Sequence, residues 1–338
     1  MPLAGATQTE HASQGKPGPA SAIRVVAPAR LHLGFLDLNG GLGRRFGSIG
    51  LAIDRPATEI VLAPAEDFSA QGPDHDRALR TLSRYAQEFA PGKAYHLDIR
   101  AAIPPHAGLG SGTQLALAIG AALITAEGLD RETTEIGELV DRGARSAIGM
   151  ASFDTGGFIV DGGRGAIDHA PPILIRTPFP EAWRALLIID PNAAGVHGDA
   201  ETRAFAELPP LPETAAAHVC RLVLMQLAPA LMESDITAFG AAVSEIQAIV
   251  GGHFAAEQGG SPWTSAAVGR IAAGLKGAGA LGIGQSSWGP TGFAFAANQE
   301  IAQRLYDSFH EAARAEGLEI LICRGRNRGA LIERIAGT

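Results

Sequence analysis

Lysine, cysteine and aromatic residues are scarce in this chain of 338 residues. Its two cysteines, Cys220 and Cys323, exclude a disulfide framework and a cysteine-rich metal site, and their apolar surroundings predict core positions. Only three of the 27 basic residues are lysines, so arginine carries nearly all the positive charge. Because arginine binds carboxylate and phosphate groups through two hydrogen bonds, any anion site is expected to use a few arginines and backbone amides.

The chain also lacks an excess of positive charge. Its net charge is −8, from 27 basic and 35 acidic residues, which excludes a general role in binding nucleic acid or an anionic membrane. No apolar run has the length that a membrane span needs, and residues 115–126 are too few. Residues 1–20 contain no apolar signal core and predict a disordered tail. We therefore expect a soluble, cytoplasmic protein with neither nucleic-acid nor membrane partners.

The composition is otherwise that of a globular protein, with 46% hydrophobic and 18% charged residues. A chain of this length is enough for one large domain or two ordinary ones. Residues 186–190 predict a buried strand, and the run that begins at Pro191 breaks it. We therefore place a domain boundary there, between an N-terminal domain at residues 21–190 and a C-terminal domain at residues 191–338.

The most informative segment is rich in proline and glycine and precedes an apolar helix. It reads Pro104, Pro105, His106, Ala107, Gly108, Leu109, Gly110, Ser111, Gly112 and Thr113. The prolines end the preceding strand, the glycines allow a sharp turn, and Ser111 or Thr113 is expected to cap the helix. A glycine-rich turn at a helix N-terminus is typical of a phosphate site, and a simple helix cap is the alternative. The spacing fits neither a Walker A loop nor a dinucleotide fingerprint.

A second candidate site lies around a predicted hairpin turn at residues 39–41, an Asn-Gly-Gly run. Asp37 and Arg44 stand seven residues apart on opposite limbs of this turn, so their side chains are expected to converge. A surface ion pair is the alternative that the spacing leaves open.

Three segments together resemble the GHMP superfamily of galactokinase, homoserine kinase and mevalonate kinase. Residues 27–35 resemble its first motif, residues 104–113 the second and residues 282–295 the third. The second motif is kept at five positions and departs at Gly112 and Thr113, where the kinases have serine and alanine. The resemblance implies an α+β GHMP kinase fold, with an N-terminal domain like ribosomal protein S5 domain 2 and a ferredoxin-like C-terminal domain.

One departure from the kinases concerns catalysis. Their Ser-Gly-x-Asp segment carries an aspartate that acts as the base, and the matching position here is Gly149. Glycine can neither accept a proton nor orient a hydroxyl group, so the resemblance implies the fold without phosphoryl transfer. Asp154 is the nearest alternative base in the sequence, and Asp161 is interpreted as a hairpin turn residue.

Within the superfamily, residues 30–44, 156–163 and 284–291 resemble the beta-ribofuranosylaminobenzene 5′-phosphate synthases. This resemblance implies that phosphoribosyl pyrophosphate condenses with 4-aminobenzoate, with release of carbon dioxide and pyrophosphate, in tetrahydromethanopterin biosynthesis. It also implies Mg²⁺ as the cofactor. An ATP-dependent small-molecule kinase and a non-catalytic sensor of a phosphorylated ligand are the alternatives.

The resemblance also suggests residue roles. Arg44 is expected to pair with the acceptor carboxylate, and Asp37 to orient the amine or stabilise the cationic intermediate. The expected substrate-binding residues are Arg30, His32, Pro105, Gly108, Leu109, Gly110, Ser111, Gly112, Thr113, Ser286, Ser287, Trp288, Gly289 and Thr291. The metal ligands, a homodimeric state, the role of His197 and the use of 4-hydroxybenzoate as acceptor stay open.

Overall fold

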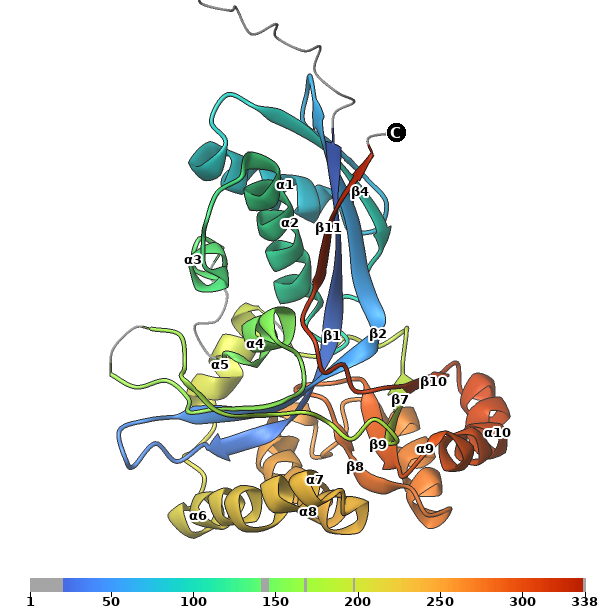
Figure 1. Ribbon diagram of the computed structural model, residues 1–338. Helices are drawn as coiled ribbons and strands as arrows, with labels where there is room; N and C mark the ends of the chain where they lie inside the picture. Colours follow the sequence, from blue (N-terminus) through green and yellow to red (C-terminus); the bar gives the residue numbers. More distant parts are fainter. Residues whose placement is uncertain (1–20, 141–145, 167–168, 197, 337–338) are drawn as a thin grey trace, which may run out of the picture.

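The computed structural model describes residues 21–140, 146–166, 169–196 and 198–336. The predicted tail at residues 1–20 and His197 lie outside the described residues. Two long antiparallel strands, β1 (Ser21–Asp37) and β2 (Phe46–Ala65), form the spine of the molecule (Figure 1). Their alternating apolar residues are buried at both ends of the pair, so each strand contributes to two separate cores.

The larger sheet has seven strands in the described chain. Its order is β11-β1-β2-β4-β3, and β5 pairs with both β2 and β6. The additional strands are β3 (Ser69–Gln71), β4 (Ala94–Ala101), β5 (Phe158–Asp161), β6 (Ile173–Thr177) and β11 (Leu331–Ala336). Strand β2 contacts β4 through its C-terminal half and β5 through its N-terminal half.

The smaller sheet has the order β10-β7-β9-β8. Its strands are β7 (Arg184–Ile189), β8 (Leu281–Gln285), β9 (Gly292–Ala296) and β10 (Glu319–Cys323). Numbered along the chain, this is the antiparallel order 4-1-3-2 with a helix before the second strand and another after the third. The structure therefore confirms the expected ferredoxin-like half.

The boundary between the two domains does not lie where the sequence predicts. Strand β7 ends at residue 189, before the predicted boundary, yet it pairs with β9 and β10 in the smaller sheet. Strand β11, near the C-terminus, returns to pair with β1. The boundary at residue 190 is therefore wrong: β7 is buried along its whole length and forms the middle of the C-terminal sheet, and the C-terminal strand completes the N-terminal one.

Helices cover both sheets (Figure 1). On the larger sheet lie α1 (His75–Phe89), α2 (Ser111–Glu127), α3 (Thr133–Glu138) and α4 (Ile148–Asp154). Helices α3 and α4 are separate, and residues 141–145 between them lie outside the described chain. The remaining helices are α5 (Asp199–Glu207), α6 (Glu213–Leu222), η1 (Val223–Leu227), α7 (Ala228–Glu233), α8 (Ile236–Phe254), η2 (Ala255–Gln258), α9 (Ala266–Gly277) and α10 (Gln299–Ala315). Helix α2 is apolar on all sides and is accordingly buried.

The continuous helical stretch Glu213–Glu233 is long and apolar enough to cross a membrane by length and composition, contrary to the expectation that no apolar run is long enough. Its mean hydropathy is 1.4, and 44% of the apolar window is buried inside the protein. Core helices of soluble proteins meet the same criterion, so one such stretch is weak evidence for a membrane span.

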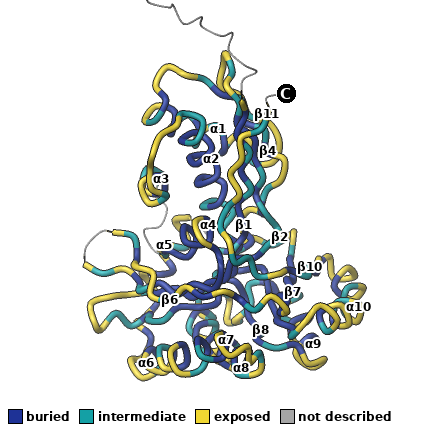
Figure 2. Tube along the Cα trace, in the orientation of Figure 1, coloured by how far each residue is buried: buried dark blue, intermediate teal, exposed yellow. Residues whose placement is uncertain are grey.

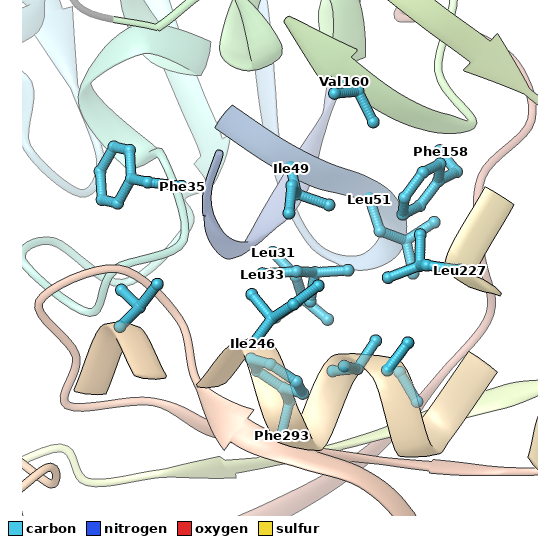
Figure 3. Packing of buried hydrophobic residues seen from close by; sticks show 14 of the residues in the cluster. Leu31, Leu33, Phe35, Ile49, Leu51, Phe158, Val160, Leu227, Ile246 and Phe293 are labelled. Atoms are coloured by element: carbon cyan, nitrogen blue, oxygen red, sulfur yellow. The ribbon is translucent and has the colours of Figure 1, made fainter. Parts of the chain in front are cut away.

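The main core lies where the two sheets meet. Figure 2 shows burial concentrated along β1 and β2 at this junction. In Figure 3, Leu33 of β1, Ile246 of α8 and Phe293 of β9 approach one another across it. Gly34 leaves the room that Ile246 needs, because a Cβ at Gly34 would lie 2.7 Å from Ile246 Cγ2. The packing of α8 against β1 therefore joins the N-terminal sheet to the C-terminal half.

The two cysteines fit the core positions that the sequence predicts. Cys323 is buried and Cys220 is half-buried, and neither forms a disulfide. Burial raises the pKa of both thiols, which opposes a role as nucleophile.

Truncation of Ile246 to alanine should lower the free energy of unfolding by about 2–5 kcal/mol, because the lost side chain leaves a cavity at the junction. Leu42→Ala is the control, since Leu42 is 91% exposed and its truncation should cost less than about 0.5 kcal/mol. Urea unfolding measures both. Equal costs would contradict the packing of Ile246 at this junction.

Candidate active site

The structure brings the three motifs together at the N-terminus of α2. Arg30 N donates to Leu109 O over 3.1 Å, and Ser287 N donates to His32 O over 3.3 Å. Gly108 is pressed against the third motif, because a Cβ there would lie 2.2 Å from Ser286 O. Residues that are far apart in the sequence therefore form one continuous surface around the glycine-rich loop.

The loop presents backbone N–H groups, as the sequence predicts. Gly108 and Gly110 have φ angles of 75° and 84°, which favour glycine, and α2 begins at Ser111. The expectation that Ser111 or Thr113 caps the helix is wrong. Gly110 is the N-cap, and no side chain accepts a hydrogen bond there. Within the described chain, the N–H groups of Ser111 and Gly112 have no partner. These two donors and the positive end of the helix dipole suit an anion.

Arg30 lies directly beside these donors. Its guanidinium group donates to Gly108 O over 2.5 Å, and a Cβ at Gly110 would meet its side chain at 3.3 Å. Burial lowers the pKa of Arg30 to about 10, and the negative charge of Glu201, on α5, partly offsets this effect. Because burial disfavours the charged form of Arg30, an anion bound next to it would stabilise that charged form.

Ser286 and Thr291 are turned into the protein. Ser286 Oγ donates to Gly108 O over 2.6 Å and accepts from His32 N over 3.0 Å, so it joins all three motifs. Thr291 is fully buried, and its hydroxyl group has no partner among the described residues. Ser286 is therefore assigned to holding the site together.

Trp288 is also part of the core. Its side chain is 2% exposed, stacks on Phe254 with ring centroids 4.2 Å apart and meets Phe205 edge-on. Ser287, by contrast, is partly exposed, and its φ of 57° lies in the left-handed region. Of the side chains predicted in the third motif, Ser287 is therefore the one left at the surface of the site.

The other predicted loop residues define its edges. Leu109 is buried, and its carbonyl oxygen accepts from Arg30 N. Pro105 is exposed at the start of the loop. Gly289 lies under the loop, where its carbonyl oxygen would be 3.0 Å from a Cβ at Gly108. These residues shape the backbone and present no side-chain polar group to a ligand.

The side chains of Asp37 and Arg44 form hydrogen bonds with backbone groups and not with each other. Asp37 Oδ1 accepts from the N–H groups of Asn39 and Gly40, which closes the turn. Arg44 donates to the carbonyl oxygens of Gly162 and Gly163 over 2.8 and 2.7 Å. Neither the expected convergence nor an ion pair between the two side chains occurs in the described chain, and their catalytic roles stay a prediction.

The place of the kinase base is filled by the loop helix. A Cβ at Gly149 would lie 3.1 Å from Thr113 Cγ2, and Gln114 Nε2 donates to Gly149 O over 2.8 Å. The two departures from the kinase motifs, at Gly149 and Thr113, are thus in contact. Asp154, the alternative base, is exposed and accepts a hydrogen bond from Thr133.

Asp161 was interpreted as a turn residue, and the structure corrects this interpretation. Its carboxylate is fully buried and accepts hydrogen bonds from the backbone N–H groups of Ser48, Ala147 and Gly163 and from Ser146 Oγ. Burial raises its pKa, and these four donors oppose the shift. Asp161 therefore joins β2, β5 and α4 behind the site. A charged residue directly after an apolar strand was the signal available in the sequence.

The described residues contain no cluster of three or more His, Cys, Asp or Glu side chains that could hold a metal ion. Magnesium at phosphate sites needs only one or two carboxylates besides the phosphates themselves. Within the described chain, the negative charge of Glu201 raises the pKa of Arg30, so one carboxylate acts electrostatically on the arginine beside the loop.

Comparison with known proteins identifies the family. Models for the N-terminal and C-terminal domains of GHMP kinases match residues 76–162 and 227–315. Beta-ribofuranosylphenol 5′-phosphate synthase of Methanothermobacter thermautotrophicus is 31% identical over 330 residues, which are 91% of this chain and 98% of that protein. The protein of the same name from Archaeoglobus fulgidus is 32% identical over 92% of this chain and 99% of its own length. The chain belongs to this synthase family of the GHMP superfamily.

Solved structures of GHMP enzymes share the fold of this synthase family member. Homoserine kinase from Cytophaga hutchinsonii superposes with a TM-score of 0.63 at 18% identity, covering 96% of this chain and all of its own. Mevalonate kinase from L. major gives 0.69 at 14% identity, covering 93% and 97%. The GHMP fold expected from the motifs is therefore confirmed.

Gly149→Ala should destabilise this synthase family member by about 1–3 kcal/mol, because the new Cβ crowds the Thr113 methyl group. Thr113→Ser removes that methyl group. In the Thr113→Ser protein, Gly149→Ala should therefore be neutral or stabilise by up to about 1 kcal/mol, because alanine favours a helix more than glycine does. Urea unfolding of the four proteins tests this double-mutant cycle. Additive effects would contradict the contact.

Proposed function

We propose that the protein condenses phosphoribosyl pyrophosphate with a para-substituted benzoate, releasing carbon dioxide and pyrophosphate. The observation that carries the proposal is an open helix N-terminus beside the half-buried Arg30, at a place where Gly149 offers no base. Such a site can bind and stabilise a pyrophosphate that leaves, and lacks the group that would activate a hydroxyl acceptor. The same feature disfavours the ATP-dependent kinase that the motifs left open.

The residues have separate parts in this reaction. The N–H groups of Ser111 and Gly112 and the Arg30 guanidinium group hold the pyrophosphate and stabilise its charge as the bond to the anomeric carbon breaks. The pyrophosphate leaves with the bonding electron pair, and the ribosyl carbon becomes cationic. The ring carbon that bears the carboxylate then attacks it. Loss of carbon dioxide returns the electron pair of its carbon–carbon bond to the ring and restores aromaticity.

Two acceptors are compatible with this reaction. The sequence motifs favour 4-aminobenzoate. The relatives' names contain a phenol, so 4-hydroxybenzoate is the acceptor that this family membership favours. The two compounds differ only at the para substituent, which makes the groups that contact this substituent decisive.

We also propose Mg²⁺ as the cofactor. It would neutralise part of the pyrophosphate charge, and Glu201 is the residue that we propose to hold it, because its negative charge acts on Arg30. Residues at the loop would then need to offset only the remaining charge.

The first experiment measures carbon dioxide and pyrophosphate released from phosphoribosyl pyrophosphate with carboxyl-labelled 4-aminobenzoate or 4-hydroxybenzoate and magnesium. The proposal expects both products in equal amounts with at least one acceptor. If ATP is instead consumed with small alcohols, the protein is a kinase. If phosphoribosyl pyrophosphate binds but nothing is released, the protein acts as a sensor, and the proposal fails.

Arg30→Met should weaken the binding of phosphoribosyl pyrophosphate by about ten- to a hundredfold, because one charge-assisted hydrogen bond to the anion is lost. The ligand-free protein should be no less stable. The pKa of Arg30 is lowered by folding, so its charge is unfavourable in the folded state below a pH of about 10, and Gly108 O keeps its bond from Ser286. Calorimetric titration and thermal unfolding measure the two effects.

The matched control is Arg24→Met. Arg24 forms ion pairs with Glu59 and Glu333 at the far end of β1. Its replacement should leave the affinity for phosphoribosyl pyrophosphate unchanged. Equal losses of affinity in both variants would contradict the role of Arg30.

A further inference from the structure

An apolar patch lies on the outer face of the helical stretch Glu213–Glu233, which consists of α6, η1 and α7. Leu224, Met225 and Met232 are 62%, 73% and 68% exposed, and only Leu42 exceeds them among the large hydrophobic residues of the described chain. Residues seven or eight positions apart lie on one side of a helix, so the three side chains form one patch. Such a concentration of exposed apolar surface is typical of a binding site for another molecule.

The opposite face of the same stretch anchors the patch. Val223, Leu227 and Leu231 are buried in the main core. Gln226 Nε2 donates to Ala238 O over 3.1 Å, which ties the π-helical turn η1 to α8. In Figure 1, α6, α7 and α8 form the lower edge of the molecule. The patch is therefore a preformed surface at the periphery of the protein.

The charged residues at the two ends of the patch have opposite signs. Arg221 lies one helical turn before Leu224 and Met225, and Glu233 directly follows Met232. Arg221 and Glu233 are exposed, and neither side chain has an ion-pair partner within the described chain. The patch thus carries a positive charge at its N-terminal end and a negative charge at its C-terminal end.

This pattern of charges is self-complementary in one orientation. A two-fold axis near residue 228 would pack two copies with their stretches antiparallel and place Leu224 of each copy opposite Met232 of the other. Arg221 of each copy would then lie beside Glu233 of the other. A two-fold axis along the helices would instead pack them in parallel and bring like charges together, which is unfavourable. The charges therefore favour a second, antiparallel copy of this chain as the partner.

A membrane surface is the other partner that an apolar helix face could have. Helices that lie on membranes carry lysine and arginine on their polar face, because anionic lipids attract these residues. Residues 213–235 contain three acidic residues, Glu213, Glu233 and Asp235, and a single basic one, Arg221. The charge of this segment therefore disfavours an anionic membrane.

We propose that the patch formed by Leu224, Met225 and Met232 is the interface of a homodimer, in which two copies pack antiparallel across a two-fold axis near residue 228. Methionine suits such an interface, because its flexible and polarisable side chain adapts to the surface of a partner. Arg221 and Glu233 determine the orientation, since each pairs with its opposite in the other copy. The dimer does not depend on the proposed reaction.

Sedimentation equilibrium of the full-length protein tests the interface. The wild type should form dimers with a dissociation constant of about 10 μM or less, as a specific interface does. Met225→Asp should weaken the dimer by about a hundredfold or more, because a charge without a partner would be buried. Leu42→Asp is the control, because Leu42 is 91% exposed outside the patch, and it should retain the wild-type dissociation constant.

Charge reversals test the orientation. Arg221→Glu and Glu233→Arg should each weaken the dimer by about tenfold, because each variant places like charges together at two symmetric positions. The double variant restores the opposite charges and should regain the wild-type dissociation constant within about threefold. The replaced side chains are exposed, so circular dichroism should show that every variant keeps the wild-type fold.

A monomeric wild type would overturn the inference. A dimer that survives Met225→Asp, or one that the double charge reversal does not restore, would overturn it as well. Vesicles that contain phosphatidylglycerol distinguish the other partner: if the wild type sediments with them as a monomer and Met225→Asp does not, the patch binds membranes and the dimer is wrong. Because no measurement uses activity, these results are separate from the test of carbon dioxide release.

Discussion

The contact between the glycine-rich loop and the third motif is the constraint on which the site depends. Ser286 Oγ binds Gly108 O and His32 N at once, and the backbones approach so closely that residue 108 has no room for a Cβ. One hydroxyl group thereby connects the long N-terminal strand, the glycine-rich loop before α2 and the ferredoxin-like sheet. The donors at the start of α2 can be preorganised because neighbouring elements on both sides hold them, which is where electrostatic binding gains most.

The loss of kinase chemistry is a matter of packing as well as of a missing carboxylate. In the kinase pattern an alanine follows the serines of the loop and an aspartate stands at the start of the later helix. Here the larger Thr113 occupies the space next to Gly149, and Gln114 binds the carbonyl oxygen of the same glycine. An aspartate at residue 149 would meet a filled space. The interior is close-packed, so a return to the kinase arrangement would need changes on both helices.

Sequence reasoning succeeded where the local pattern alone determines structure. The apolar run after the loop, the glycines with positive φ and the alternating strands of the C-terminal half all predicted what the structure contains. It failed where long-range packing decides. Trp288 and Ser286 look like ligand-binding residues in the sequence, but the first fills an aromatic cluster and the second binds backbone atoms. Likewise, β7 and β11 join sheets that their place in the chain does not reveal, and the four donors around Asp161 come from three segments.

The same fold can support either phosphoryl transfer to an acceptor or departure of pyrophosphate from a sugar. The charges around Arg30 bear on this difference. In a kinase the terminal phosphate passes to an acceptor that a base has activated, so the site must hold a cation and a base near the same atom. A site that expels pyrophosphate needs only to stabilise the negative charge that develops on the leaving group. In the function that we propose, the half-buried guanidinium group of Arg30, whose pKa burial lowers, and the N–H groups of Ser111 and Gly112, which have no partner in the described chain, gain a favourable interaction only when an anion binds. Because that gain increases as charge moves onto the pyrophosphate, it lowers the barrier to departure.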